Sequence, residues 1–306
     1  MVGPVAAAAA LAVCVAAASC TSTTESVPAA GTTLRISGTT AADFQNVVLS
    51  LPDLRFQVAT EGGSSITSLH DLRRGTIDVS LPMADVAYLA YSGQLEEMPG
   101  RFDRLRGMAV LTLNAVHLIA GGHTTVRTIR DLRGLKISLG PPGSAIAPIA
   151  EQLLKATGIG LNDVDGTRLP NPEIPDKLAR RQIDAAFVTF APPNAGVSAM
   201  AKGGARLVAI AGPAIEDVRT RYPYLKRTVI PGMTYPNQQE TVHTIGVDVL
   251  MVCRADLDEQ VVYRLLDVYF ATRPATRPPD LERAPATPIP LHPGAARYYR
   301  QRELSR

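Results

Sequence analysis

The sequence has no tryptophan, few aromatic residues and only a small excess of positive charge. Aromatic residues make up 5% of its 306 residues, and the formal net charge is +3. Nucleic-acid-binding proteins of this size usually carry a basic patch with interleaved aromatic side chains, so we expect no nucleic-acid partner. Hydrophobic residues make up 46% and charged residues 19%, which excludes a chain of the disordered class.

Cysteine is also scarce, with only Cys14, Cys20 and Cys253. Three cysteines are too few for a disulfide framework. No cysteines or histidines have the spacing of a metal site, so we expect neither metal nor cofactor. Cys253 closes an apolar run and is typical of a buried structural thiol.

Enzyme motifs are missing as well. The chain has no G-x-S-x-G nucleophile turn and no Gly-rich phosphate-binding fingerprint. No histidine has an evident role as a base. We therefore expect a binding protein and not an enzyme.

The N-terminus has the pattern of a secreted protein. Residues 5–18 are almost wholly Ala, Val and Leu, a run long enough for a signal peptide and short for a spanning helix. Small residues precede Cys20, which resembles the lipobox of bacterial lipoproteins, where the cysteine becomes the lipid-modified N-terminus. We predict a signal peptide over 1–19, a lipid anchor at Cys20 on the outer face of the membrane, and a flexible tether over 20–32. Ordinary secretion is the alternative.

Beyond the tether, strand and helix patterns alternate. This alternation predicts an α/β fold with a parallel sheet covered by helices. A Pro- and Tyr-rich segment, residues 213–241, is expected to be an ordered loop. Strands are expected at residues 34–37, 54–60, 77–81, 107–119, 135–139, 183–190, 207–210 and 242–253, and helices at 39–50, 64–74, 85–91, 126–132, 145–156, 171–181, 194–202, 256–272 and 294–300.

One plan occurs twice in the chain. Asp78 and Asp184 each follow an arginine-bearing helix end and an isoleucine, and each opens an apolar strand. These equivalent positions indicate an architectural role. Two similar α/β lobes would leave a cleft between them, and ligands bind such sheets at the carboxyl ends of strands.

Several short motifs resemble the TAXI family of solute-binding proteins, the extracytoplasmic receptors of TRAP-type transporters. They span most of residues 60–300 in the family's order: IDVSL (77–81), ADVAY (84–88), VHLIA (116–120), LGPPGS (139–144), QIDAAFV (182–188), IPGMTYP (230–236) and PIPLHPGAARYY (288–299). The resemblance implies a type II periplasmic-binding-protein fold, in which two α/β lobes joined by a two-strand hinge close over a small organic acid. Lobe 1 would comprise residues 33–118 with 243–306, and lobe 2 residues 119–242. The crossings would lie within 111–119 and 242–252.

The turn over residues 140–144 is the best candidate for contact with ligand. It leads from a strand into a helix, whose N-terminus presents free N–H groups and a positive dipole end. Pro142 and Gly143 belong to this turn, where Gly143 permits close backbone approach and Ser144 supplies a hydroxyl. A carboxylate would fit there. A tight turn with Ser144 as a helix cap is the alternative.

Other candidates lie where strands end or helices begin. Threonine hydroxyls there can donate hydrogen bonds, and aromatic rings can wall a pocket. Asp85 is equally a candidate helix N-cap, and Tyr235 is either a residue that closes over the ligand or loop packing. The further candidate ligand-binding residues are Thr39, Thr40, Asp85, Thr189, Phe190 and Tyr235.

We therefore predict a receptor that captures a small organic acid, either an amino acid or a dicarboxylate or 2-oxoacid. Its partner would be the integral-membrane subunit of a TRAP-type secondary transporter. The turn at residues 37–43 is shorter than in the family and lacks its tyrosines, which leaves open a sensory or scaffolding lipoprotein that kept the fold without transport. An extracytoplasmic hydrolase or transferase acting through Ser144 is a further alternative.

Overall fold

The structure is a computed structural model that describes residues 1, 33–37, 55–59, 64–141, 144, 146–273 and 280–304. The predicted signal peptide, tether and helix at 39–50 lie outside these residues, as do the candidates Cys20, Thr39, Thr40, Pro142 and Gly143. In the part of the chain that is described, no helix is long and apolar enough to cross a membrane.

The described residues form a single ten-stranded sheet. Its strands are β1 (Thr33–Ser37), β2 (Arg55–Ala59), β3 (Val79–Ser80), β4 (Leu105–Ala120), β5 (Lys136–Ser138), β6 (Asp165–Thr167), β7 (Ala185–Phe190), β8 (Arg206–Val208), β9 (Leu225–Ile230) and β10 (Val242–Arg254). The order is β2-β1-β3-β10-β4-β7-β5-β6, with β8 also paired to β4 and β9 to β10.

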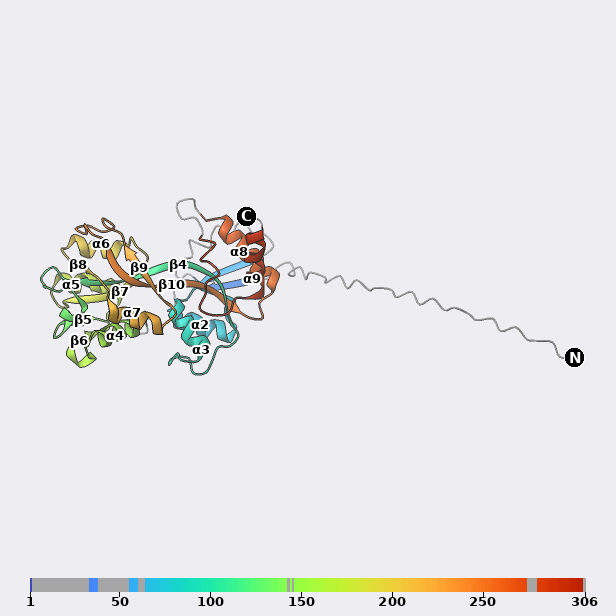
Figure 1. Ribbon diagram of the computed structural model, residues 1–306, viewed down its shortest axis with the longest axis horizontal. Coiled ribbons are helices and arrows are strands. Elements are labelled where there is room, and N and C mark those ends of the chain that lie inside the picture. Colours follow the sequence, from blue (N-terminus) through green and yellow to red (C-terminus); the bar gives the residue numbers. More distant parts are fainter. Residues whose placement is uncertain are drawn as a thin grey trace.

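Two long central strands join the halves of this sheet. β4 and β10 run antiparallel from the pair Gly246 and Ala115 to the pair Arg254 and Leu105. On one side β1 pairs in parallel with β2 and β3, and on the other β5 pairs in parallel with β6 and β7. Figure 1 shows β4 and β10 running between the two groups of elements. The molecule is therefore two α/β lobes joined by a two-strand hinge.

Helices cover both faces of the sheet. They are α2 (Ser65–Arg74), α3 (Ala84–Ser92), α4 (Ile146–Ala156), α5 (Ile174–Ala179), α6 (Ala195–Lys202), α7 (Pro213–Arg221), α8 (Glu259–Ala271) and α9 (Pro293–Leu304), with 3₁₀ turns η1 (Ile129–Leu132), η2 (Leu161–Asp163) and η3 (Asn171–Glu173). In Figure 1, α2, α3, α4 and α7 lie below the central strands, and α6 and α8 lie above them. One apolar core underlies the lower helices of both lobes, and two smaller cores lie beneath α8 with α9 and beneath α5 with α6.

Local sequence signals explain most element ends. The Ser64 hydroxyl accepts a hydrogen bond from the backbone N–H of Thr67 at the start of α2, and Gly75 ends that helix with a φ of 77°. Glycine adopts this left-handed conformation without steric strain, because it has no Cβ. Leu69 and Leu72 of α2 have the spacing of one helix face, and both are buried.

The two repeated aspartates have the architectural role that was expected of them. Asp78 Oδ2 accepts the backbone N–H of Arg35 in β1 at 2.9 Å, and Asp184 Oδ2 accepts that of Lys136 in β5 at 2.9 Å. Asp78 also receives two hydrogen bonds from the Arg35 guanidinium. Each aspartate thus ties the start of its own strand to the backbone of the neighbouring strand.

The prediction of a loop over residues 213–241 was wrong in its first part, which contains α7 and β9. Pro213 occupies the first turn of α7, where its missing N–H costs nothing. β9 pairs with β10 alone and has its middle residues partly exposed. Because the middle side chains of this edge strand are partly exposed, its sequence lacks the apolar pattern by which a strand is predicted. The short, exposed strand β6 was not predicted for the same reason.

Candidate functional site

Two cavities lie where the lobes meet, and they use different helices. We call the first the hinge pocket. It encloses about 290 Å³ and is lined by the middle of β4, the end of α8 and Pro192, which follows β7. The second, the tyrosine pocket, encloses about 410 Å³ and is lined by α2, α3, α4 and the segment between α7 and β9. Lobe 1 and lobe 2 both contribute to each.

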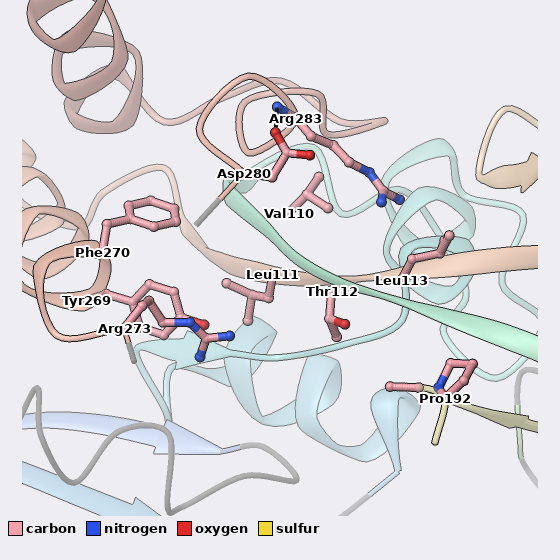
Figure 2. Close-up of a pocket in the computed structure, with 11 residues that line it drawn as sticks. Val110, Leu111, Thr112, Leu113, Pro192, Tyr269, Phe270, Arg273, Asp280 and Arg283 are labelled. Carbon is pink, nitrogen blue, oxygen red and sulfur yellow. Dashed lines mark hydrogen bonds between the residues drawn. The ribbon is translucent and has the colours of Figure 1, made fainter. Parts of the chain in front are cut away.

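The hinge pocket contains two arginines. Arg273 follows α8, and its guanidinium lies 5.1 Å from the centroid of the Tyr269 ring. Figure 2 shows the Arg273 side chain on the same side of the pocket as Tyr269 and Leu111. Arg283 donates a hydrogen bond to the carboxylate of Asp248 in β10. These two arginines and Thr112 line one cavity at the point where the chain crosses between lobes.

Asp248 is a buried partner for one of these charges. Its exposed fraction is 2%, and burial raises its pKa although the charge of Arg283 opposes the rise. The backbone N–H of Arg283 is in turn accepted by Asp280 Oδ1 at 3.0 Å. Arg283 is therefore fixed by carboxylates on two sides, and the segment that begins at Asp280 is anchored to the hinge.

The tyrosine pocket brings together residues of both lobes. Asp85 lies in the first turn of α3, and Ser144 lies two residues before α4. Asp85 is 2% exposed, and its Oδ1 has no hydrogen-bond partner among the described residues. Burial raises the pKa of this carboxyl to about 6, against hydrogen bonds from the local backbone.

The amino-acid sequence from residue 29 to residue 302 matches the NMT1-like family. The chain belongs to the NMT1-like family. Among solved structures, it is similar to the periplasmic aliphatic sulphonate binding protein SsuA from Escherichia coli, with a TM-score of 0.51, 15% identity, and coverage of 90% of this chain and 76% of that one. A periplasmic sulfonate-binding protein from Methylobacillus flagellatus KT gives a TM-score of 0.49 at 15% identity, covering 79% and 68%.

The first of these similarities establishes the fold of this NMT1-like protein. It is the type II periplasmic-binding-protein fold that the sequence motifs predicted, and its two hinge strands are β4 and β10. At 15% identity the likeness concerns the fold alone.

The predicted turn at residues 140–144 is only partly described in the NMT1-like chain. The Ser144 hydroxyl donates a hydrogen bond of 2.6 Å to the carbonyl of Pro141. Gly140 has a φ of 112°, and a Cβ there would lie 2.2 Å from Ile146 Cγ2. Glycine is thus required at this position. Contact of Ser144 with a ligand stays a prediction.

The prediction that Asp85 caps its helix was wrong, because Met83 occupies the cap position and Asp85 lies inside the first turn. Negative side chains are favoured throughout that turn, so sequence alone could not distinguish the two positions.

Thr189 and Phe190 end β7, directly before the Ala191 and Pro192 of the hinge pocket. The Thr189 hydroxyl is buried without a hydrogen-bond partner in the described ranges, and Phe190 packs against the core beneath α6. The structure thus places this strand end beside a cavity, and ligand contact by either side chain stays a prediction.

Tyr235 is 3% exposed and lines neither cavity. Its hydroxyl accepts the backbone N–H of Asn194 at 3.2 Å and shares a 2.9 Å hydrogen bond with His117 Nε2. Burial lowers the pKa of His117 to about 4, so the ring is neutral at pH 7. These contacts hold the start of α6, and closure of Tyr235 over a ligand stays a prediction.

Sequence reasoning missed Thr112, Arg273 and Arg283. Thr112 could have been noticed in the sequence, because it is one of the few polar residues of the crossing strand, with Arg106, Asn114 and His117. The arginines lay in a Pro- and Arg-rich stretch whose position depends on the packing of α8 and α9.

Two other predictions concern reactive groups. Cys253 is fully buried, as predicted, and burial raises the pKa of its thiol. Within the described ranges, no group of three or more His, Cys, Asp or Glu residues could hold a metal ion.

Proposed function

We propose that this NMT1-like protein is an extracytoplasmic solute receptor whose two lobes close on a small organic anion. The observation that carries the proposal is the hinge pocket, which Arg273, Arg283 and Thr112 line together at the crossing between lobes. Guanidinium groups bind carboxylates and sulfonates through paired charge-assisted hydrogen bonds. An anion beside Thr112 would contact β4, the end of α8 and the turn after β7 together.

Binding of this kind makes or breaks no covalent bond in the ligand. A ligand that touches both lobes favours the closed arrangement, because the closed form offers it more contacts than the open form. The hinge strands would absorb the movement. Residues 33–118 with 243–306 are the proposed first moving unit and residues 119–242 the second, which the central position of β4 and β10 supports.

The proposed ligand class is an amino acid, dicarboxylate or 2-oxoacid, and the proposed partner is the integral-membrane subunit of a TRAP-type transporter. The motif resemblance to TAXI receptors supports this choice. We further propose that Cys20 carries the lipid anchor, which would hold the receptor on the outer face of the cell membrane. If there is no lipid anchor, the receptor would be periplasmic. The sulphonate-binding protein with this fold makes sulfonates a second anion class to test.

The test is a thermal-shift screen of the purified protein, unfolded and refolded first to remove carried-over ligand. The panel holds amino acids, dicarboxylates, 2-oxoacids, alkyl sulfonates and neutral sugars. A ligand at about 1,000 times its Kd adds about 4 kcal/mol to the free energy of unfolding. We expect shifts from one anion class and none from the sugars.

Arg273→Gln should weaken that binding at least about tenfold, since a charge-assisted contact contributes about 1.5–3 kcal/mol. Arg130→Gln is the matched control, because Arg130 is exposed on η1 and lines neither cavity. Equal binding by the Arg273 variant, or binding of sugars alone, would refute the anion site.

Transport is tested separately, with vesicles that contain the TRAP-type membrane subunits from the same genome. Uptake of the bound anion that requires this protein would support the transport role. Tight binding without any uptake would favour the sensory or scaffolding role.

A further inference from the structure

The tyrosine pocket has an aromatic wall that the anion-binding role does not use. Tyr222 and Tyr224 both line it, with ring centroids 5.5 Å apart. Tyr88 of α3 extends the cluster, since its ring centroid lies 5.8 Å from that of Tyr224. Faces of aromatic rings carry negative potential and attract organic cations.

Two residues that line this cavity each carry a buried hydrogen-bond acceptor without a donor in the described part of the chain. Oδ1 of Asp85 in lobe 1 and Oε1 of Gln152 in lobe 2 have no partner among the described residues. Asp85 as a whole is only 2% exposed. A buried acceptor that lacks a donor costs free energy, and the large majority of such groups in proteins are satisfied. A ligand that carries N–H donors would satisfy both.

Most of the charged residues that line the tyrosine pocket are acidic. Asp85, Glu96, Glu97 and Glu151 line the cavity, and Arg168 is the one basic residue among its described lining residues. Arg168 is already held by Glu151 at 2.6 Å. The remaining acidic groups would repel an anion and attract a cation.

We propose that the tyrosine pocket binds an organic ammonium cation, with Asp85 and Gln152 accepting its N–H groups and Tyr222 and Tyr224 packing against its alkyl or methyl groups. The cavity volume of about 410 Å³ is in the range of small-molecule sites. The cation would bridge α3 of lobe 1 to α4 of lobe 2. This site is built from other residues than the hinge pocket and does not rest on the proposed anion site.

Ionisation of Asp85 gives the site a pH signature. The titratable groups around it are Tyr88 on α3, Tyr222 and Tyr224 before β9, Glu151 on α4, Arg168 after β6, and Glu96 and Glu97 after α3. Burial, together with the charge of Asp85, raises the pKa of Tyr224, so that phenol stays protonated. With its pKa near 6, Asp85 is charged at about pH 8 and mostly protonated at about pH 5.

The test is isothermal titration calorimetry of the whole protein with n-butylamine, putrescine and tetramethylammonium. Butanol and butyrate are the matched probes, of similar size but without a cation. We expect the amines to bind and the matched probes to fail at this site. Amine affinity should be at least fivefold weaker at about pH 5 than at about pH 8, since only about a tenth of Asp85 is then charged.

Asp85→Asn should lower amine affinity at least tenfold, and Tyr222→Ala severalfold. The half-buried Tyr222 keeps the test decisive if the Asp85 variant fails to fold. Asp103→Asn is the control, because Asp103 is exposed and lines neither cavity. The proposal is overturned if no amine binds, if butanol binds as well as butylamine, or if both pocket variants bind amines like the unmodified protein. Arg273→Gln should leave amine binding unchanged, so the two sites fail or succeed independently.

Discussion

Replacing Asp85 by Asn should stabilise the ligand-free protein at neutral pH. The pKa of Asp85 is raised from the ordinary 3.8 to about 6. Folding therefore has to bury a charged carboxylate at pH 7, a group that the unfolded chain keeps in water. At about 1.4 kcal/mol per pKa unit, this burial costs about 3 kcal/mol, which the neutral asparagine avoids.

The sign and the pH range of this effect follow from the raised pKa. Well below about pH 4 the carboxyl is protonated in both the folded and the unfolded state, so the variant should gain little there. As the pH rises from about 4 to about 6, only the unfolded state loses its proton, and the unmodified protein loses stability relative to the variant. Above about pH 6 the gap should stay constant.

The assay is thermal unfolding of both proteins without amine, across the range from about pH 4 to pH 8. At the upper end we expect the variant to melt about 6–12 °C higher, given about 2–4 °C per kcal/mol for a chain of this size. Asp131→Asn is the matched control of opposite sign. Hydrogen bonds from the backbone of Arg127 and Thr128 lower the pKa of Asp131, so its removal should destabilise. A variant of Asp85 that melts no higher at about pH 7.5, or a gap that does not change with pH, would refute the reasoning.

Three further predictions concern residues that shape the lobes. Gly140→Ala should cost about 1–3 kcal/mol in thermal unfolding, because φ is 112° and the new Cβ would meet Ile146; an unchanged midpoint would contradict the turn geometry. Asp78→Asn should cost about 1–3 kcal/mol at pH 7, because hydrogen bonds from Arg35 lower the carboxyl pKa despite burial. That loss should shrink as the pH falls through the lowered pKa, and a loss that persists unchanged in acid would exclude the ion pair as its cause. Tyr235→Phe should lower the melting temperature and leave the anion Kd unchanged, since its hydroxyl bonds to His117 of β4 and to the start of α6, outside both cavities; a weakened Kd with normal stability would instead place Tyr235 at the ligand.

Most of the elements could be predicted because their signals are local. α2 has a serine that caps it, leucines at helical spacing and a glycine at its end, so its bounds were predicted within one residue. α7 and β9 were missed because neither has this combination of a side-chain cap, apolar spacing and a terminal glycine. α7 begins at a proline, and β9 is an edge strand whose alternation is weak.

The repeated aspartates were predicted as a pair for a different reason. Asp78 and Asp184 stand in the same sequence context, and a repeated context indicates a repeated structural role. The structure shows what that role is: each carboxylate accepts a hydrogen bond from a backbone N–H of the neighbouring strand. Sequence could indicate the equivalence but not the partner.

By itself the sequence determined the α/β alternation, the two-lobe plan and the turns at which strands meet helices, because periodicity and capping act over a few residues. Only the tertiary structure decided which of those ends meet. Asp85 and Gln152 line one cavity, and Thr112 and Arg273 line another, because β4 and β10 cross between the lobes and bring distant segments together. The charge of each cavity is a property of that long-range pairing and not of any local stretch of chain.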